Sequence, residues 1–349
     1  MMERKTIGDI CIPLRKEIIK QGDLKDDGKY PVVNSGVTPY GHYNAFNNDG
    51  NAFTLASRGE YAGFITYLQN KFWAGGLCYP YRSKDESLCS TKYVYNYLKS
   101  RERYIMETLV MRGGIPALNK ADVDKIQIPI PPLSEQTHIV DILDTFTASI
   151  DNLKEQIAER RKQYEHYRDK LLDLEGKEGV EIKQLGDKCK LERGVRVVKR
   201  DLQEEGSIPV YQNSLTPLGF YERSNYPPKT TFVICAGAAG EIGFCNNAFW
   251  AADDCTCIVC PALVDSKYIY YYLMTKQHTL KSQVRKASVP RLSKDVIAKL
   301  QIPVPSLSEQ SRIVSILDTF EASIQNLEAQ LKEREKQYEY YRNKLLTFE

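Results

Sequence analysis

The chain carries the same 51-residue segment twice, 174 positions apart. Residues 125–175 and 299–349 match at 34 of 51 positions without a gap. The regions before them, 1–124 and 176–298, are of nearly equal length but correspond only weakly. Two copies of one element must occupy equivalent places, so an internal repeat of this size constrains the fold more than any other feature. The sequence therefore predicts one duplicated frame that holds two diverged modules.

Each repeat opens with a proline-rich segment, IPIPPLSEQ at 128–136 or IPVPSLSEQ at 302–310. Proline disfavours helix in the residue before it, so this segment is predicted to be extended. Ser134 and Ser308 are then the expected N-caps of the helices that follow. Gly176 suits the end of the first helix, because glycine adopts the left-handed conformation that often ends helices.

Apolar residues recur within each repeat in steps of 3 and 4 for more than four heptads. This spacing is the pattern of a coiled-coil seam, and ordinary surface helices rarely keep it so long. The leading seam positions are Leu143, Phe146, Ile150, Leu153 and Ile157 in the first copy and Leu317, Phe320, Ile324, Leu327 and Leu331 in the second. Arg160 and Arg334 interrupt the seam at the same place. A polar residue there can fix the register, or its long stem can reach solvent.

The excess of basic residues lies in the two modules and not in the repeats. Residues 1–132 hold 18 Lys and Arg against 14 Asp and Glu, and residues 176–306 hold 18 against 13. Residues 133–175 hold 6 against 10, and residues 307–349 hold 6 against 8. If the partner is a nucleic acid, the modules are therefore expected to bind it.

Shared landmarks predict one mixed α/β fold for both modules. YVYNYL at 93–98 and YIYYYL at 268–273 each predict the start of a helix, and FWA recurs at 72–74 and 249–251. Short strand-like runs alternate with Gly, Asn and Pro. GAAGEIG at 237–243 has the wrong spacing for a dinucleotide site and predicts a tight loop between strands.

The cysteines predict core positions in a reducing compartment and no metal site. Cys11 and Cys78 fall opposite Cys189 and Cys255 when the halves are overlaid. Cys245, Cys255, Cys257 and Cys260 superficially resemble zinc ligands, but their spacing is unlike common zinc modules, and DDCTCIVCP predicts a buried strand.

The sequence favours a cytoplasmic protein without catalytic groups of its own. Its start lacks an apolar signal core, and no apolar stretch is long enough to span a bilayer. The phosphate-binding motif GxxxxGK[ST] does not occur, and neither does the Asn/Asp-Pro-Pro-aromatic motif of amino-methyltransferases. We therefore expect no cofactor on this chain.

The doubled signature resembles the specificity (S) subunit of type I restriction–modification enzymes. The resemblance rests on IPIPPLSEQ followed by IVDILD, and on IPVPSLSEQ followed by IVSILD, each heading a long helix after a variable module. It covers the whole chain and implies two α/β (α+β) target-recognition domains, 1–127 and 176–301. Their lead-in and helix segments, 128–175 and 302–349, would form an antiparallel coiled coil with an internal pseudo-twofold repeat.

This resemblance also implies a function. Each module would read one half of a split, asymmetric target in double-stranded DNA, and the helices would set the spacing. The helices would dock two modification (methyltransferase) subunits, which bring S-adenosylmethionine, and restriction subunits can join. The S subunit itself would catalyse nothing. The alternatives are a coiled-coil scaffold whose modules bind protein and a stand-alone DNA-modifying enzyme, which the missing motifs disfavour.

Contacts to DNA would come from basic and amide side chains, which neutralise phosphates and reach base edges. The candidates are Asn34, Thr38, His42, Arg58, Lys71 and Arg112 in the first module and Gln212, Asn213, Lys229, Arg285, Lys286 and Arg291 in the second. VRKASVPR at 284–291 stands in place of VMRGGIPA at 110–117, so Arg112 and Lys286 coincide. For any single residue, a solvated surface position is the alternative.

Several positions off the seam are also the same in both repeats. If one kind of partner binds twice, these identities are explained, although recent duplication explains them as well. The positions are Asp144 and Asp318, Thr145 and Thr319, Asn152 and Asn326, and Gln163 and Gln337.

Overall fold

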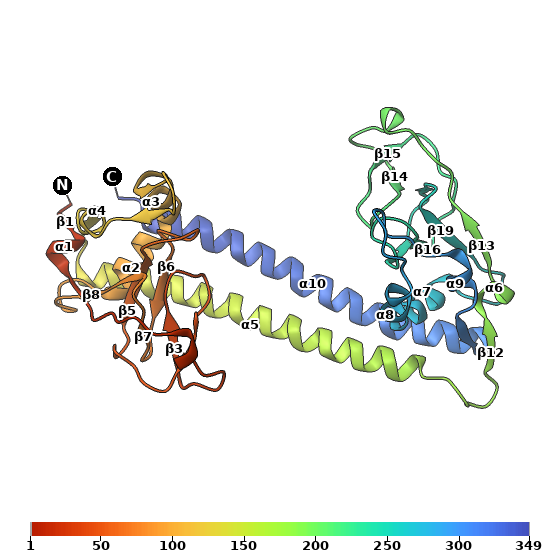
Figure 1. Cartoon of the computed structure of the whole chain (residues 1–349), viewed down its shortest axis with the longest axis horizontal. Coiled ribbons are helices and arrows are strands. Elements are labelled where there is room, and N and C mark those ends of the chain that lie inside the picture. Colours follow the sequence, from red (N-terminus) through yellow and green to blue (C-terminus); the bar gives the residue numbers. More distant parts are fainter. Residues whose placement is uncertain (1, 349) are drawn as a thin grey trace. The chain divides into compact units, whose positions relative to one another are not determined.

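The computed structural model describes residues 2–348, without the side chain of Lys199, and divides into two compact units (Figure 1). Unit 1 comprises Met1–Lys154 and Gln330–Glu349, and unit 2 comprises Glu155–Ala329. Each unit therefore contains one module together with a stretch of each long helix.

The long helices are α5 (Leu133–Leu172) and α10 (Leu307–Leu345). The predicted N-caps Ser134 and Ser308 are wrong, because both residues lie in the first turn. The carbonyls of Pro132 and Ser306 already accept the first helical bonds, at 3.1 and 3.0 Å. Proline holds φ near the helical value, so the turn can begin directly after Pro132.

The predicted end of the first helix at Gly176 is also wrong. Helix α5 ends at Leu172, and Gly176 lies four residues later in a turn, where its φ of 75° suits glycine. Leu174, between them, remains buried in the core of unit 2 although it lies outside the helix. The apolar spacing therefore continued beyond the helix that it predicted.

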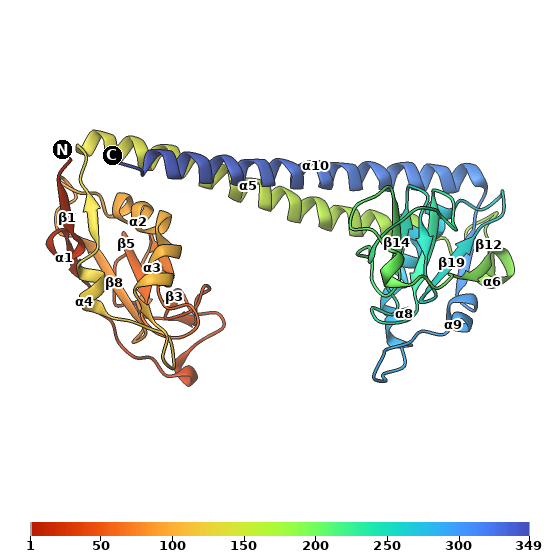
Figure 2. The ribbon, with the colours of Figure 1, turned by 90° about the horizontal axis from the view of Figure 1, so that it is seen from above.

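Within each unit the two helix stretches lie side by side and run antiparallel (Figures 1 and 2). In unit 1 the ring of Phe146 stacks on Tyr341, with centroids 5.3 Å apart, and Lys154 lies 3.7 Å from Glu335. The partner number in α10 falls as the number in α5 rises. Unit 2 follows the same rule through the ion pair of Arg161 with Glu328 and the stack of Tyr167 on Phe320.

The arginines that interrupt the seam pack on aromatic rings. The guanidinium of Arg334 lies 5.7 Å from the ring centroid of Phe146 in unit 1, and that of Arg160 lies 5.9 Å from Phe320 in unit 2. A guanidinium over a ring face is a cation–π contact, which stabilises by about 0.5–1 kcal/mol where it is exposed. Each arginine thus has a packing role that neither sequence-based explanation contained.

The module of unit 1 is built on a four-stranded antiparallel sheet and a separate three-stranded sheet. The first has the order β2-β8-β5-β6, the second the order β4-β3-β7, and two ribbons, β1-β11 and β9-β10, complete the module. The bounds are β1 Arg4–Thr6, β2 Cys11–Pro13, β3 Tyr30–Val33, β4 Gly41–Tyr43, β5 Ala52–Ala56, β6 Ile65–Leu68, β7 Trp73–Ala74, β8 Cys78–Ser83, β9 Val110–Met111, β10 Ala117–Leu118 and β11 Gln127–Pro129.

Unit 2 repeats this plan with the orders β13-β19-β16-β17, β15-β14-β18 and β12-β20. The bounds are β12 Glu181–Gln184, β13 Lys190–Arg193, β14 Ile208–Tyr211, β15 Gly219–Tyr221, β16 Thr230–Ile234, β17 Ile242–Cys245, β18 Trp250–Ala251, β19 Cys255–Val259 and β20 Gln301–Val304. The run DDCTCIVCP contains β19, as predicted, and GAAGEIG spans the turn into β17.

Short helices cover the sheets at matching places in both units. The prediction that YVYNYL and YIYYYL begin helices is confirmed by α2 and α7. The bounds are α1 Ile7–Ile10, α2 Thr91–Ser100, α3 Glu102–Thr108 and α4 Lys120–Asp124 in unit 1 and α6 Leu185–Lys188, α7 Ser266–Thr275, α8 Gln277–Ser282 and α9 Lys294–Ala298 in unit 2.

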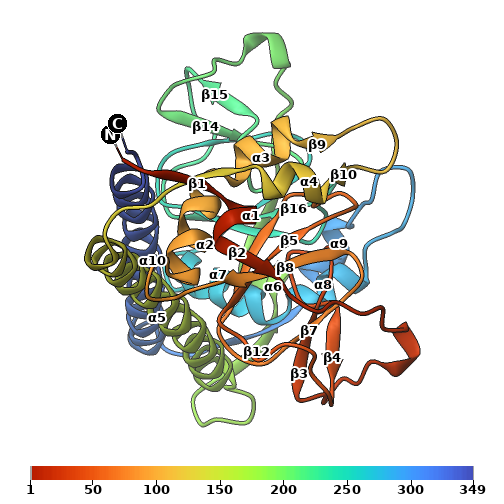
Figure 3. The same cartoon turned by 90° about the vertical axis from the view of Figure 1, so that its left-hand side faces the viewer.

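Helix α2 lies between the four-stranded sheet and the long helices of unit 1 (Figure 3). Its Tyr93 and Tyr97 are four residues apart, so they share one face, and both are buried in a core that also takes in Ile139 and Leu143 of α5. The hydroxyl of Tyr93 donates to the carbonyl of Pro129 at 2.9 Å. The core of the module therefore includes the first turns of α5.

The glutamine of the SEQ signature fastens each module to its long helix. Gln136 is fully buried; it accepts a hydrogen bond from the Ser90 amide at 2.9 Å and donates to the carbonyls of Pro131 and Leu88. Gln310 in unit 2 repeats all three bonds. A buried amide is favourable only when its donors and acceptors are paired, and both of these are.

Asp144 and Asp318, which repeat off the seam, bind lysines of their own modules. Lys92 lies 2.8 Å from Asp144 in unit 1, and Lys267 lies 2.8 Å from Asp318 in unit 2. The identity of these two positions therefore has a cause within each unit, and no external partner is needed to explain it.

Candidate nucleic-acid interface

Three loops of unit 1 lie together: residues 34–40 after β3, 57–63 after β5, and 112–116 at the tip of the β9-β10 hairpin. The second loop is bonded to the third, because the amide of Gly59 donates to the carbonyl of Pro116 at 2.9 Å. The φ of Gly59 is 95°, a conformation that favours glycine. Asn34 and Thr38 line a hollow of about 510 Å³ beside this junction.

The matching loops of unit 2 are 212–218, 235–240 and 285–291. Here the amide of Gly237 donates to the carbonyl of Pro290 at 3.2 Å, and the amide of Ala238 donates to the carbonyl of Asn213 at 2.9 Å. A smaller hollow of about 180 Å³ contains Arg291 and two aspartates in its lining. We call the three loops of either module its loop face.

The structure places nine of the twelve predicted DNA contacts on these loop faces. They are Asn34, Thr38, Arg58 and Arg112 in unit 1 and Gln212, Asn213, Arg285, Lys286 and Arg291 in unit 2. The other three lie on different elements. His42 is on β4, Lys71 precedes β7 and lies 3.8 Å from Asp49, and Lys229 precedes β16 with a φ of 61°.

The two half-buried amides among these candidates already bind their own modules. The side-chain oxygen of Asn34 accepts a hydrogen bond from the Leu77 amide at 2.7 Å. The side-chain nitrogen of Gln212 donates to Asp254 at 3.4 Å. Both residues thus help to shape the loop faces, whatever else they contact.

Sequence reasoning missed a basic loop beside each loop face. In unit 1 it follows β2 and carries Arg15, Lys16 and Lys20; Lys16 donates to the carbonyl of Gly76 at 3.1 Å, next to the hollow. The loop of unit 2 follows β13, whose last residue, Arg193, lines the same hollow as Arg291. The run RGVRVVKR at 193–200 was a signal of local charge that the module totals concealed.

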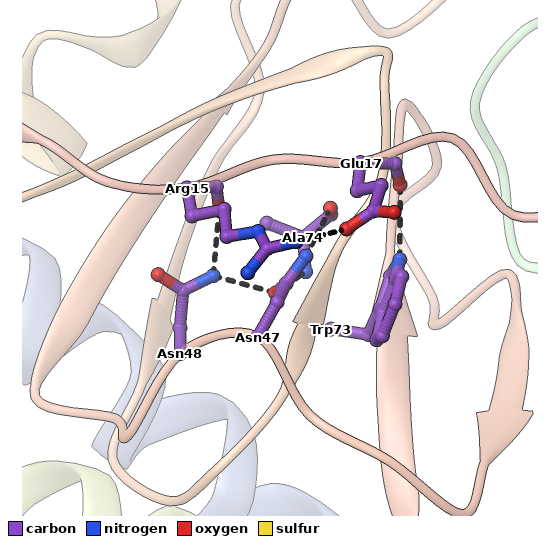
Figure 4. Close-up of polar contacts among 6 residues, drawn as sticks. All are labelled: Arg15, Glu17, Asn47, Asn48, Trp73 and Ala74. Carbon is purple, nitrogen blue, oxygen red and sulfur yellow. Dashed lines mark hydrogen bonds and ion pairs between the residues drawn. The ribbon is translucent and has the colours of Figure 1, made fainter.

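The shared FWA motif holds this basic loop in place (Figure 4). The indole of Trp73 donates to the carbonyl of Glu17 at 2.9 Å, and Asn48 donates to the carbonyl of Arg15 at 2.9 Å. Asn47 forms two bonds with the backbone of Ala74, at 2.7 and 3.0 Å. The backbone of the loop is therefore fixed, and two of its basic side chains are paired as well, Arg15 with Glu17 at 2.9 Å and Lys16 with the carbonyl of Gly76.

Unit 2 contains the same fastening. Trp250 donates to the carbonyl of Val195 at 2.7 Å, and Asn225 forms two bonds with the backbone of Ala251, at 2.8 and 2.9 Å. The recurrence explains why FWA survives in modules that otherwise correspond weakly.

The paired cysteines are core residues in both units. Cys11, Cys78, Cys189 and Cys255 are all buried, and burial raises the pKa of the Cys11 and Cys78 thiols to about 12. A thiol must lose its proton to act as a nucleophile or metal ligand, so these two are inert at neutral pH.

Among residues 2–348, His, Cys, Asp and Glu form no group of three that could hold a metal ion. Nor is any helix in that range long and apolar enough to cross a membrane.

Residues 1–160 and 177–335 match the family model described as the type I restriction modification DNA specificity domain. The chain belongs to this family of specificity subunits. A Haemophilus influenzae protein named as a type I restriction enzyme specificity subunit is 30% identical, over 96% of this chain and 91% of that protein. The specificity subunit of the Escherichia coli enzyme EcoR124I/EcoR124II is 27% identical, over 95% of this chain and 90% of its own length.

Solved structures of specificity subunits share the fold. The S subunit of a type I restriction–modification system from M. genitalium superposes with a TM-score of 0.80 at 21% identity, covering 100% of this chain and 97% of that one. A chain from a structure of type I complex assembly gives a TM-score of 0.59 at 18% identity. The predicted family and fold class are therefore confirmed, whereas the domain boundaries and the contact residues stay predictions.

Proposed function

We propose that this specificity subunit reads a bipartite, asymmetric DNA sequence, one half with each module. The proposal rests on a contrast between two parts of each module, its attachment to the long helices and its loop face. Their attachments to the helices share the hydrogen bonds of Gln136 and Gln310, whereas their loop faces carry different side chains. Two different readers on one duplicated frame should recognise two different half-sites.

The long helices are proposed to set the spacing between half-sites and to bind two methyltransferase subunits. Each unit has the same aromatic stack, in which a half-buried phenylalanine contacts an arginine and an exposed tyrosine. In unit 1 these are Arg334, Phe146 and Tyr341, beside a hollow of about 550 Å³, and the neighbouring Tyr340 is 61% exposed. Aromatic and arginine side chains are enriched where proteins bind each other, which supports docking here.

The chemistry would then belong to the partners. The methyltransferase subunits would supply S-adenosylmethionine, and restriction subunits could join the same complex. This chain would contribute position and sequence choice.

The test is to express the chain with its methyltransferase subunits and to map methylated adenines by long-read sequencing. The expected motif is non-palindromic, with two specified parts separated by unread bases. A continuous or palindromic motif would contradict the proposal, and so would the same methylation without this chain.

A further inference from the structure

Two arginines occupy mirrored places on the loop faces. In unit 1 Arg58 lies opposite Ala117 across an isolated antiparallel bridge, and in unit 2 Ala236 lies opposite Arg291 across another. Each bridge joins the loop after an inner strand of the four-stranded sheet, β5 in unit 1 and β16 in unit 2, to the matching hairpin segment. Each pair thus contains one arginine and one alanine, but the arginine changes sides between the modules.

The two bridges have the same backbone geometry. In unit 1 the amides of Gly59 and Leu118 donate to the carbonyls of Pro116 and Ser57, both at 2.9 Å. The same two bonds recur in unit 2 at 3.2 and 2.8 Å. Bonds that flank a pair in this way mark the closely spaced kind of antiparallel pair, whose Cα atoms lie about 4.5 Å apart. The two side chains of such a pair project from the same face. The arginine therefore points the same way in both modules, but it occupies one position of the pair in unit 1 and the other position in unit 2.

Resting on DNA recognition by the modules, we propose that this bridged pair is a base-reading position, and that Arg58 and Arg291 each read a guanine. Arginine reads guanine through two hydrogen bonds to O6 and N7 in the major groove. The shift of about 4.5 Å compares with a rise of about 3.4 Å per base pair. Relative to its module, the guanine read by Arg291 therefore lies about one step from the one read by Arg58.

The comparison of the modules separates base contacts from phosphate contacts. The backbone phosphates are the same in both half-sites, so a residue that binds them should stay basic in both modules, as Arg112 and Lys286 do. In the bridged pair, by contrast, neither position is basic in both modules, because each arginine of one module is matched by an alanine in the other. Both Arg58 and Arg291 are exposed, and neither side chain forms an ion pair or hydrogen bond with any residue in the described range 2–348.

Arg291 also faces a second arginine. The backbones of Arg285 and Arg291 exchange two hydrogen bonds, at 2.9 and 3.2 Å, where unit 1 has Met111 and Ala117. Like charges directly opposite each other destabilise a pair of strands. In the described part of unit 2 no carboxylate lies within ion-pair distance of either side chain. The acceptor-rich edge of guanine and its flanking phosphate would relieve this repulsion.

The experiment uses the complex of this chain with its methyltransferase subunits and selects bound duplexes from a library with randomised half-sites. Arg58→Ala should lower the preference for guanine at one position of one half-site, roughly 5- to 150-fold, and leave the other half-site unchanged. Arg58→Ala combined with Ala117→Arg should restore a guanine preference about one position away. Ala236→Arg with Arg291→Ala should do the converse in the other half-site.

Arg58→Lys keeps the charge but replaces the planar fork with one flexible ammonium, so it should lower the guanine preference, less than Arg58→Ala does, while the salt dependence stays the same. This variant gives the test if Ala117→Arg prevents folding. Arg103→Ala, which removes an exposed arginine paired with Glu107 on α3, is the control and should change nothing. Uniform weakening on all sequences with a smaller salt slope would make Arg58 a phosphate contact and overturn the proposal. An unchanged motif would overturn it too, whereas a wild-type complex that selects no bipartite motif would instead refute the proposed function.

Discussion

The two modules agree where they face the helices and differ where they face away. Tyr93 and Tyr268 donate to equivalent proline carbonyls at 2.9 and 2.8 Å, and the lysine–aspartate pairs both measure 2.8 Å. On the loop faces, by contrast, the arginine of the bridged pair lies on the loop after β5 in unit 1 and on the hairpin segment in unit 2. The attachment must fit a duplicated helix, so any change there disrupts contacts that the repeat imposes. The loops face no such template and can diverge.

The largest expected effect on stability comes from replacing the buried glutamines Gln136 and Gln310, and it shows whether the two are equivalent. Gln136→Leu leaves the amide of Ser90 and two carbonyls without their partner, and each unpaired buried group costs about 1–3 kcal/mol. We expect the free energy of unfolding to fall by about 2–5 kcal/mol, measured by urea denaturation of the full chain. Gln310→Leu should cost a similar amount. Gln163→Leu is the control, because among the described residues the Gln163 side chain bonds only to Glu159; a loss as large there would remove the special role of the signature glutamine.

A smaller effect should distinguish the two aspartates. Asp318 binds Lys267 and also accepts a hydrogen bond from the Tyr271 hydroxyl at 2.6 Å. In unit 1 Asn96 occupies the place of Tyr271, and its buried side-chain nitrogen has no partner among the described residues. Asp318→Ala should therefore cost about 2–3 kcal/mol and Asp144→Ala about 1 kcal/mol, again by urea denaturation. Equal losses would mean that the tyrosine bond contributes nothing.

The exposed aromatic stack tests partner docking. Tyr340→Ala removes an exposed side chain whose ring contacts its neighbours Tyr341 and Lys344 on the same helix, so the stability of the chain should change little. Binding of methyltransferase subunits should weaken by about 1–2 kcal/mol, measured by titration calorimetry. His166 is the matching residue of the first repeat, and His166→Ala should weaken the second site less because imidazole buries less surface. Unchanged binding in both variants would place the docking surface elsewhere.

The smallest effect concerns Glu321, which has no acidic counterpart in the first repeat. Burial raises the pKa of this carboxyl, so its charged form is disfavoured in the folded chain. Stability from this group is present at acid pH and is lost as the pH rises through the raised value. Glu321→Gln should therefore raise stability at neutral pH by up to about 1 kcal/mol and have little effect near pH 4. Melting curves across this range would show the opposite trend if Lys267 held the carboxylate charged.

The long helices, the module helices and the family could be predicted from the sequence because they depend on local spacing. The loop faces could not, because they depend on which loops the sheets bring together. Arg58 and Ala117 are 59 positions apart in the chain, and only the fold sets them opposite each other. The role of Asp144 was missed for the same reason, since its lysine lies 52 positions away. The N-cap prediction failed on a finer point, the ability of Pro132 to start a turn itself.

The division of the long helices between the two units has a consequence for synthesis. Unit 1 needs the last part of α10 and the residue that follows this helix, Leu346, which is buried in its core. Unit 2 is continuous in the chain and can be complete first. At roughly 5–20 residues per second, the first module waits about 10–35 s on the ribosome with its core incomplete. The module made first is thus the last to finish folding, and over that interval it is the part of the nascent chain most open to chaperones and to aggregation.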